Sequence, residues 1–243
     1  MYSDINPTFP DVKWYEYSYR KFFEPTETYE TWKFSGAWDY PEKDQLRFSN
    51  IITNNVDLLT EKRVLDLGCH IGYLSLFALH NNATFVTGVN IRNDELAIGK
   101  EVIALAGYRN AEFISHDVTD FEWLATECSK HDTVIIAGLI YHLTDFVGFF
   151  RAITYSTAKN LIIESEILDT EQAYCKVVVE DATFRTNGVD PDGKETCLSI
   201  VPSRKFIVDI LQFLGWNTDR ESTQVTKTSF GREHTRLTLT ATR

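Results

Sequence analysis

The chain has 243 residues and a formal net charge of −11, with 43% hydrophobic and 24% charged residues. This composition is ordinary for a globular protein, and the length suits one α/β domain with a complete core. Phosphate backbones are bound through clustered Lys and Arg, so the acidic balance favours a small molecule over a nucleic acid as partner. No run of about 18 apolar residues predicts a transmembrane helix, and the first residues do not resemble a secretory signal.

The cysteines give no sign of a metal site or a disulfide framework. Cys69, Cys128, Cys175 and Cys197 are widely spaced and form no CxxC pair. They also lack metal-ligand spacing with histidine. We therefore expect reduced thiols, no bound metal and a cytoplasmic location.

The first part of the chain differs from the rest in its aromatic content. Residues 1–43 hold 13 of the chain's 32 aromatic residues. A disordered tail would be poor in such residues, so we interpret this stretch as a cap packed on the core. It is either a lid over a substrate site or an extension that covers a sheet face. The main domain is expected over residues 44–243.

Strands and helices alternate from Asp44 onwards. After a first helical pattern, the predicted strands are residues 63–67, 84–90, 111–115, 132–138 and 160–164. The predicted helices are residues 73–80, 93–106, 121–128 and 145–155, with Asn93 as an N-cap and Gly107 at a C′ position. Alternation at this spacing predicts a parallel sheet with helices on both faces.

The alternation breaks after Ile167. Two strand-like runs, residues 175–179 and 197–201, flank a turn-rich stretch and predict a small β insertion over about residues 170–200. Pro202-Ser203 then opens a helix that ends near Leu214. Two further strands, residues 223–228 and 235–242, bring the predicted sheet to seven strands.

The strongest signal is a glycine-bearing turn in VLDLGCHIGYL, residues 64–74. Gly68 and Gly72 lie where a strand turns into a helix, where unusual backbone angles and free N–H groups are needed. A missing Cβ at such a glycine also lets the main chain approach a ligand. Such a turn also occurs with no ligand, or with a dinucleotide. Here Asp66 ends the first strand, where its carboxylate could hold an ammonium group. Asn90 ends the second strand at the ribose-reading position, and Asp117 follows the third.

These residues resemble the first motif and strand ends of class I S-adenosylmethionine-dependent methyltransferases, over roughly residues 44–216. The resemblance implies a Rossmann-like fold with a mostly parallel seven-stranded sheet, and S-adenosylmethionine as cofactor. It implies the methionine part at the turn, the ribose at Asn90 and the adenine at Asp117 and Val118. The turn residues so assigned are Asp66, Gly68, His70 and Gly72. Two of these positions depart from the family: His70 replaces a glycine, and Asn90 replaces an acidic residue and lacks its charge.

A second set of residues resembles a narrower family, the bacterial tRNA uridine-5-oxyacetate carboxymethyltransferases, which use carboxy-S-adenosylmethionine. The similar segments are residues 137–142, residues 164–169 and Pro202-Ser203. The resemblance implies that Ala137 and Tyr141 contact the cofactor and that Arg236 pairs with its extra carboxylate. It also places Trp38 and Lys43 on the cofactor side. The family's N-terminal region is longer, and the acidic balance disfavours tRNA as the substrate.

The resulting hypothesis is methyl transfer to a small-molecule acceptor. Because the sulfonium is already activated, the protein mainly has to orient the acceptor and exclude water. His142 is the candidate general base, beside Tyr141. Three alternatives remain open: carboxymethyl transfer to tRNA uridine, a nucleotide-dependent oxidoreductase, and a non-catalytic relative that binds the cofactor.

Overall fold

The computed structural model describes residues 47–181, 196–227 and 233–243. The predicted aromatic cap over residues 1–43, with Trp38 and Lys43, lies outside the described residues, as does the middle of the predicted insertion. The chain divides into two compact units, Met1–His116 and Asp117–Arg243.

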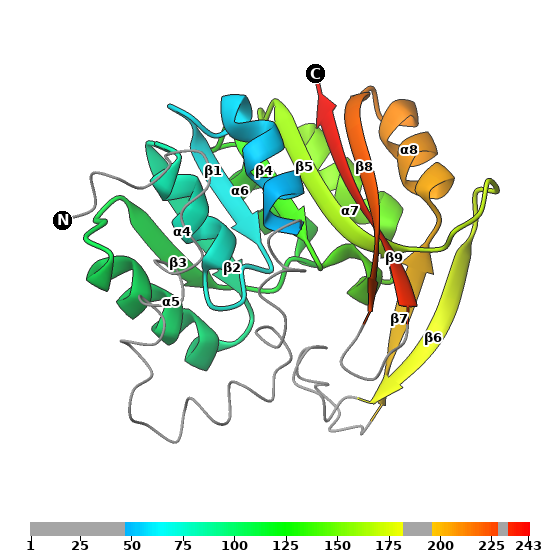
Figure 1. Ribbon diagram of the computed structural model, residues 1–243, viewed down its shortest axis with the longest axis horizontal. Helices are drawn as coiled ribbons and strands as arrows, with labels where there is room; N and C mark the ends of the chain where they lie inside the picture. Colours follow the sequence, from blue (N-terminus) through cyan, green and yellow to red (C-terminus); the bar gives the residue numbers. More distant parts are fainter. Residues whose placement is uncertain (1–46, 182–195, 228–232) are drawn as a thin grey trace. The chain divides into compact units, whose positions relative to one another are not determined.

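The first unit is built on three parallel strands in the order β3-β2-β1. The strands are β1 (Arg63–Leu67), β2 (Phe85–Asn90) and β3 (Ala111–Ser115). Its helices are η1 (Thr53–Leu58), α4 (Tyr73–His80) and α5 (Asn93–Leu105). Right-handed crossovers that step in one direction place α4 and α5 on the same face of these strands (Figure 1).

Phe113 of β3 determines how closely the elements of this unit approach one another. A Cβ at Gly72, Gly88 or Gly99 would lie 2.8, 2.7 or 2.9 Å from a ring carbon of Phe113. Gly72 also has φ of 81°, in the left-handed region that favours glycine. We expected the absent Cβ at Gly72 to give a ligand access to the main chain. This expectation is wrong, because the Phe113 ring occupies that space and glycine is needed there for packing.

The second unit holds four strands in the order β4-β5-β9-β8 and a separate hairpin. The strands are β4 (Thr133–Ala137), β5 (Asn160–Ile167), β8 (Asn217–Lys227) and β9 (Glu233–Thr242), and the helices are α6 (Phe121–Cys128), η2 (Ile140–His142), α7 (Phe146–Tyr155) and α8 (Arg204–Phe213). Strand β5 runs parallel to β4 and antiparallel to β9, which is antiparallel to β8. The hairpin, β6 (Cys175–Asp181) with β7 (Thr196–Pro202), falls in the predicted insertion (Figure 1).

The strand order of the sheet is β3-β2-β1-β4-β5-β9-β8, and β9 runs antiparallel to both of its neighbours, β5 and β8. This order confirms the mostly parallel seven-stranded α/β fold. Among the described residues, no helix is long and apolar enough to cross a membrane.

Most predicted boundaries agree with the structure within a residue or two. Strand β5 extends to Ile167, three residues past its predicted end, and two further expectations differ. Asn93 is not the N-cap of α5: Arg92 holds that position, with no side-chain cap bond, and Asn93 is the first helical residue. Gly107, with φ of 90°, follows the C-cap as expected. Strand β8 begins at Asn217, well before the predicted residue 223.

Candidate functional site

The loop between β1 and α4 has three left-handed residues in alternation. Gly68, His70 and Gly72 have φ of 71°, 52° and 81°. For a residue with a side chain this conformation costs about 1–2 kcal/mol, so His70 adopts a disfavoured geometry here. The N–H groups of Gly68 and Cys69 both donate to the Val89 carbonyl at 2.9 Å, which ties the loop to β2.

Asp66 is a buried carboxylate beneath this loop. The residue is 1% exposed, and its Oδ2 accepts a hydrogen bond of 2.7 Å from the Ser75 hydroxyl of α4. Burial raises the pKa of Asp66 to about 6, although the Ser75 bond opposes the rise. Sequence reasoning missed Ser75 as the partner, because its position on α4 relative to the loop could not be read from the residue types.

Asn90, at the end of β2, belongs to a polar network that we did not anticipate. Its Nδ2 donates to Oε2 of Glu95 at 2.6 Å, and its Oδ1 accepts from the Ile91 N–H at 2.9 Å. The other Glu95 oxygen, Oε1, accepts from Arg92 at 2.8 Å and lies 3.5 Å from Nε2 of His70. Burial lowers the pKa of His70, and the Glu95 charge works against that shift.

The first unit therefore gathers the residues predicted for the amino-acid and ribose parts of a nucleoside. The oxygen atoms of these side chains are hydrogen-bond acceptors, which is the chemistry that such a ligand requires. Asp66 offers a carboxylate for an ammonium group, and Glu95 and Asn90 offer oxygen acceptors near the end of β2. This set fits S-adenosylmethionine.

The residues predicted for the adenine lie in the second unit. Oδ1 of Asp117 accepts from both the N–H and the hydroxyl of Thr119, at 2.9 and 2.8 Å. Val118 is 7% exposed. The Asp117 carboxylate thus organises the turn that leads to α6, a role that the sequence did not suggest.

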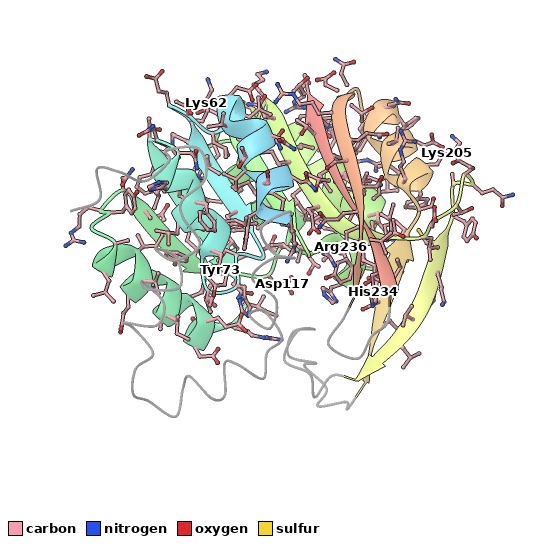
Figure 2. The ribbon with its side chains drawn as sticks, in the orientation of Figure 1. Lys62, Tyr73, Asp117, Lys205, His234 and Arg236 are labelled. Atoms are coloured by element: carbon pink, nitrogen blue, oxygen red, sulfur yellow. The ribbon has the colours of Figure 1, made fainter. Side chains whose placement is uncertain are left out.

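Strands β5 and β9 carry a row of charged side chains on one face. Glu166 is paired in register with Arg236, and alternation puts Glu164 and His234 on the same side. The guanidinium of Arg236 binds both carboxylate oxygens of Glu164, and Nδ1 of His234 lies 2.5 Å from Oε1 of Glu166. Figure 2 shows Arg236 and His234 along β9. Burial alone would lower the pKa of Arg236, but the Glu164 charge raises it above its usual range.

Tyr141 and His142 follow β4 in the short η2 turn, next to this row. Their rings lie 4.2 Å apart between centroids, and Cζ of Arg236 is 5.6 Å from the Tyr141 ring centroid. Nδ1 of His142 lies 3.4 Å from the hydroxyl of Ser199, a buried residue of β7. The hairpin thus supports His142, which the sequence could not indicate, since the two residues are 57 positions apart.

In the structure, Tyr141 lies beside both His142 and Arg236. Ala137 ends β4 and is paired in register with Glu164. Arg236 was expected to meet a carboxylate of the cofactor, but its guanidinium already binds Glu164. Sequence reasoning also missed the pairing of His234 with Glu166, because neither residue belongs to a motif.

Comparisons with known proteins agree with this picture. A family model described as a methyltransferase domain matches residues 58–206. Protein arginine N-methyltransferase 1 of Oryza sativa subsp. indica is 25% identical over 166 residues, which is 67% of this chain and 42% of that protein. The chain therefore spans less than half the length of this curated relative.

Two solved structures share the fold. Magnesium protoporphyrin IX methyltransferase from Synechocystis PCC 6803 with bound SAH has a TM-score of 0.57 and 20% identity, covering 96% of this chain and 100% of that one. The N-terminal domain of EvdMO1, in the presence of SAH and D-fucose, has a TM-score of 0.59 and 15% identity, covering 83% and 82%.

The fold and the loop after β1 define the class I S-adenosylmethionine-dependent methyltransferases. The chain belongs to the methyltransferase-domain family, since the family model covers more than half of it.

Proposed function

We propose that this protein transfers a methyl group from S-adenosylmethionine to a small-molecule acceptor. The observation that carries the proposal is the loop of residues 66–72, in which a buried carboxylate lies beneath three left-handed residues. Asp66, Gly68, His70 and Gly72 would hold the amino-acid end of the cofactor. Asn90 lies on the ribose side, with Asp117 and Val118 assigned to the adenine and Ala137 and Tyr141 to the region near the reacting carbon.

The choice of a small-molecule acceptor rests on the net charge and on the name of one structural neighbour. The net charge of −11 is unfavourable for tRNA. A structural neighbour is named as a magnesium protoporphyrin IX methyltransferase, and the acceptor in that name is a small molecule. Arginine methylation of a protein is the second candidate, because the curated relatives carry that activity in their names.

Methyl transfer is better supported than carboxymethyl transfer. The latter was expected to use Arg236 as the partner of the cofactor's extra carboxylate. Glu164 already neutralises this guanidinium and is itself 1% exposed. Displacing Glu164 would leave a buried carboxylate unpaired, which typically costs several kcal/mol.

The residues of the second unit would act on the acceptor. When bound, the cofactor supplies a methyl group on a positively charged sulfur. An acceptor hydroxyl or amine loses a proton as it takes the methyl group, and we assign His142 as the base that would receive that proton. Ser199 and Tyr141 hold the His142 ring from two sides. The Glu164–Arg236 pair fixes Tyr141 in turn.

The test is formation of S-adenosylhomocysteine from S-adenosylmethionine with a panel of small hydroxyl and amine compounds, and with arginine peptides. We expect turnover with a small molecule and a mass gain of one methyl group. His142→Gln should lower kcat by about 10²–10⁴-fold, because a general base contributes about that much. His234→Gln, at another histidine of this unit, is the matched comparison.

Three outcomes would change the assignment. Turnover with arginine peptides alone would replace the acceptor class. A carboxymethyl mass gain with the carboxylated cofactor would restore the alternative. If His234→Gln abolished turnover and His142→Gln left it intact, His142 would not be the base.

A further inference from the structure

We infer that Glu95, and not Asn90, is the residue that binds the ribose hydroxyls of the nucleoside cofactor, and that Asn90, Arg92 and His70 position it. The inference rests on the proposed function, since it concerns the same cofactor. It assigns the ribose contact to the first turn of α5, five residues beyond the end of β2.

Asn90 is poorly suited to hold the two hydroxyls by itself. Its Oδ1 accepts the N–H of Ile91, which leaves one lone pair. Its Nδ2 is a donor and points to Glu95 at 2.6 Å. A ribose diol offers O–H donors, so it needs acceptors, and an amide also lacks the charge that makes such bonds strong.

Glu95 supplies what Asn90 lacks. Each of its carboxylate oxygens is held by a neighbour, Oε2 by Asn90 and Oε1 by Arg92. Each oxygen keeps a further lone pair for a hydroxyl. The side chain is 12% exposed, so the group is largely shielded from water, where a charge-assisted bond gains strength.

His70 fits the same arrangement. It occupies a left-handed position, with φ of 52°, that glycine would take at no cost. Its Nε2 lies 3.5 Å from Oε1 of Glu95. The imidazole thus links the loop after β1 to the Glu95 carboxylate. His70 and Asn90, the two residues that differ from the family pattern, therefore both lie next to Glu95.

A purely structural role for Glu95 makes a different prediction. If the carboxylate only held Arg92 and the loop, its loss would weaken all ligands equally. If it binds the diol, its loss would matter only for ligands that have the hydroxyls. A cycle that combines protein variants with ligands lacking one hydroxyl separates the two roles.

The experiment is calorimetric titration of the full chain with S-adenosylhomocysteine and with its 2′-deoxy and 3′-deoxy analogues. We expect the wild type to bind the deoxy analogues about 10–100-fold more weakly, the range for a lost hydrogen bond to a charged group. Glu95→Gln should bind S-adenosylhomocysteine with a similar loss and discriminate little among the three ligands. Asn90→Ala should keep most of the discrimination.

A double variant tests whether the loss in Glu95→Gln comes from the missing carboxylate or from a disturbed fold. Glu95→Gln combined with Asn90→Asp returns a carboxylate to the end of β2, and discrimination for the diol should return. Undiminished discrimination in Glu95→Gln, or its loss in Asn90→Ala alone, would overturn the inference. Wild-type protein that fails to bind S-adenosylhomocysteine at all would overturn the proposed function instead.

Discussion

Asp66 is fully buried, and the hydrogen bond that it accepts from Ser75 offsets only part of the cost of burying a charge. Its pKa rises from 3.8 to about 6 because burial disfavours the ionised form. The folded state therefore holds this proton more tightly than the unfolded state. The contribution of Asp66 to the free energy of unfolding is therefore highest at low pH and falls as the pH rises from about 3.8 to about 6. At neutral pH the folded protein carries a buried, ionised carboxylate that lowers its stability.

Asp66→Asn should remove this dependence. The amide has a similar shape and can still accept from Ser75 through its oxygen. We expect the variant to match the wild type at about pH 4 and to exceed it by up to about 3 kcal/mol at pH 8. Urea unfolding at both pH values measures the difference. An equal difference at the two pH values would show that the carboxylate does not titrate between them.

The two residues that depart from the family illustrate what a single sequence can tell. Position 90 was recognised as a ribose position, and its lack of charge was evident from the residue type. That Glu95 lies beside it depends on α5 starting at Asn93 and on the turn through Ile91 and Arg92. Local backbone geometry of this kind is not encoded in hydrophobic spacing, so the network became visible only in the structure.

Among the secondary-structure elements, the C-terminal end of α7 is capped by the side chain of Arg243, which is distant in sequence. The guanidinium of Arg243 donates to the carbonyls of Thr154, Ser156 and Ala158. It also lies 4.5 Å above the ring of Trp216, whose Nε1 donates to the hydroxyl of Thr154 at 2.8 Å. The carbonyls at a helix end lack partners within the helix, and a cation there is favourable.

Arg243→Ala should lower the free energy of unfolding by about 1–3 kcal/mol, because several carbonyls lose a charged donor. Urea unfolding followed by tryptophan fluorescence measures the loss. Arg151→Ala, on the exposed side of α7, is the control and should change stability by less than about 0.5 kcal/mol. Equal effects in the two variants would argue against a capping role for Arg243.

The elements were largely predictable where apolar periodicity is strong. Helix α4, strand β3 and helix α6 match the expected residues. Helix α4 is mostly apolar, and Asp120 caps the start of α6 through its side chain. Strand β8 was predicted too short, since its first half, NTDRES, has no apolar alternation and is held by backbone pairing with β9. The Glu164–Arg236 pair joins residues 72 positions apart, so no local pattern could reveal it.

For the whole molecule, the residues predicted for the site belong to two compact units, each described by itself. The first carries the residues proposed for the amino-acid and ribose parts of the cofactor. The second carries Tyr141, His142 and the charged row on β5 and β9. Residues proposed for the cofactor therefore occur in both units, because Asp117 and Val118, assigned to the adenine, belong to the second.

Titration of the full chain with S-adenosylmethionine measures whether the loop after β1 binds this cofactor. We expect binding of one equivalent to the wild type, and affinity at least about tenfold weaker in Asp66→Ala and Gly68→Val, since a lost charged contact is worth about that much. Circular dichroism would verify that both variants remain folded. Unchanged affinity in both folded variants, or no binding to the wild type, would contradict the account.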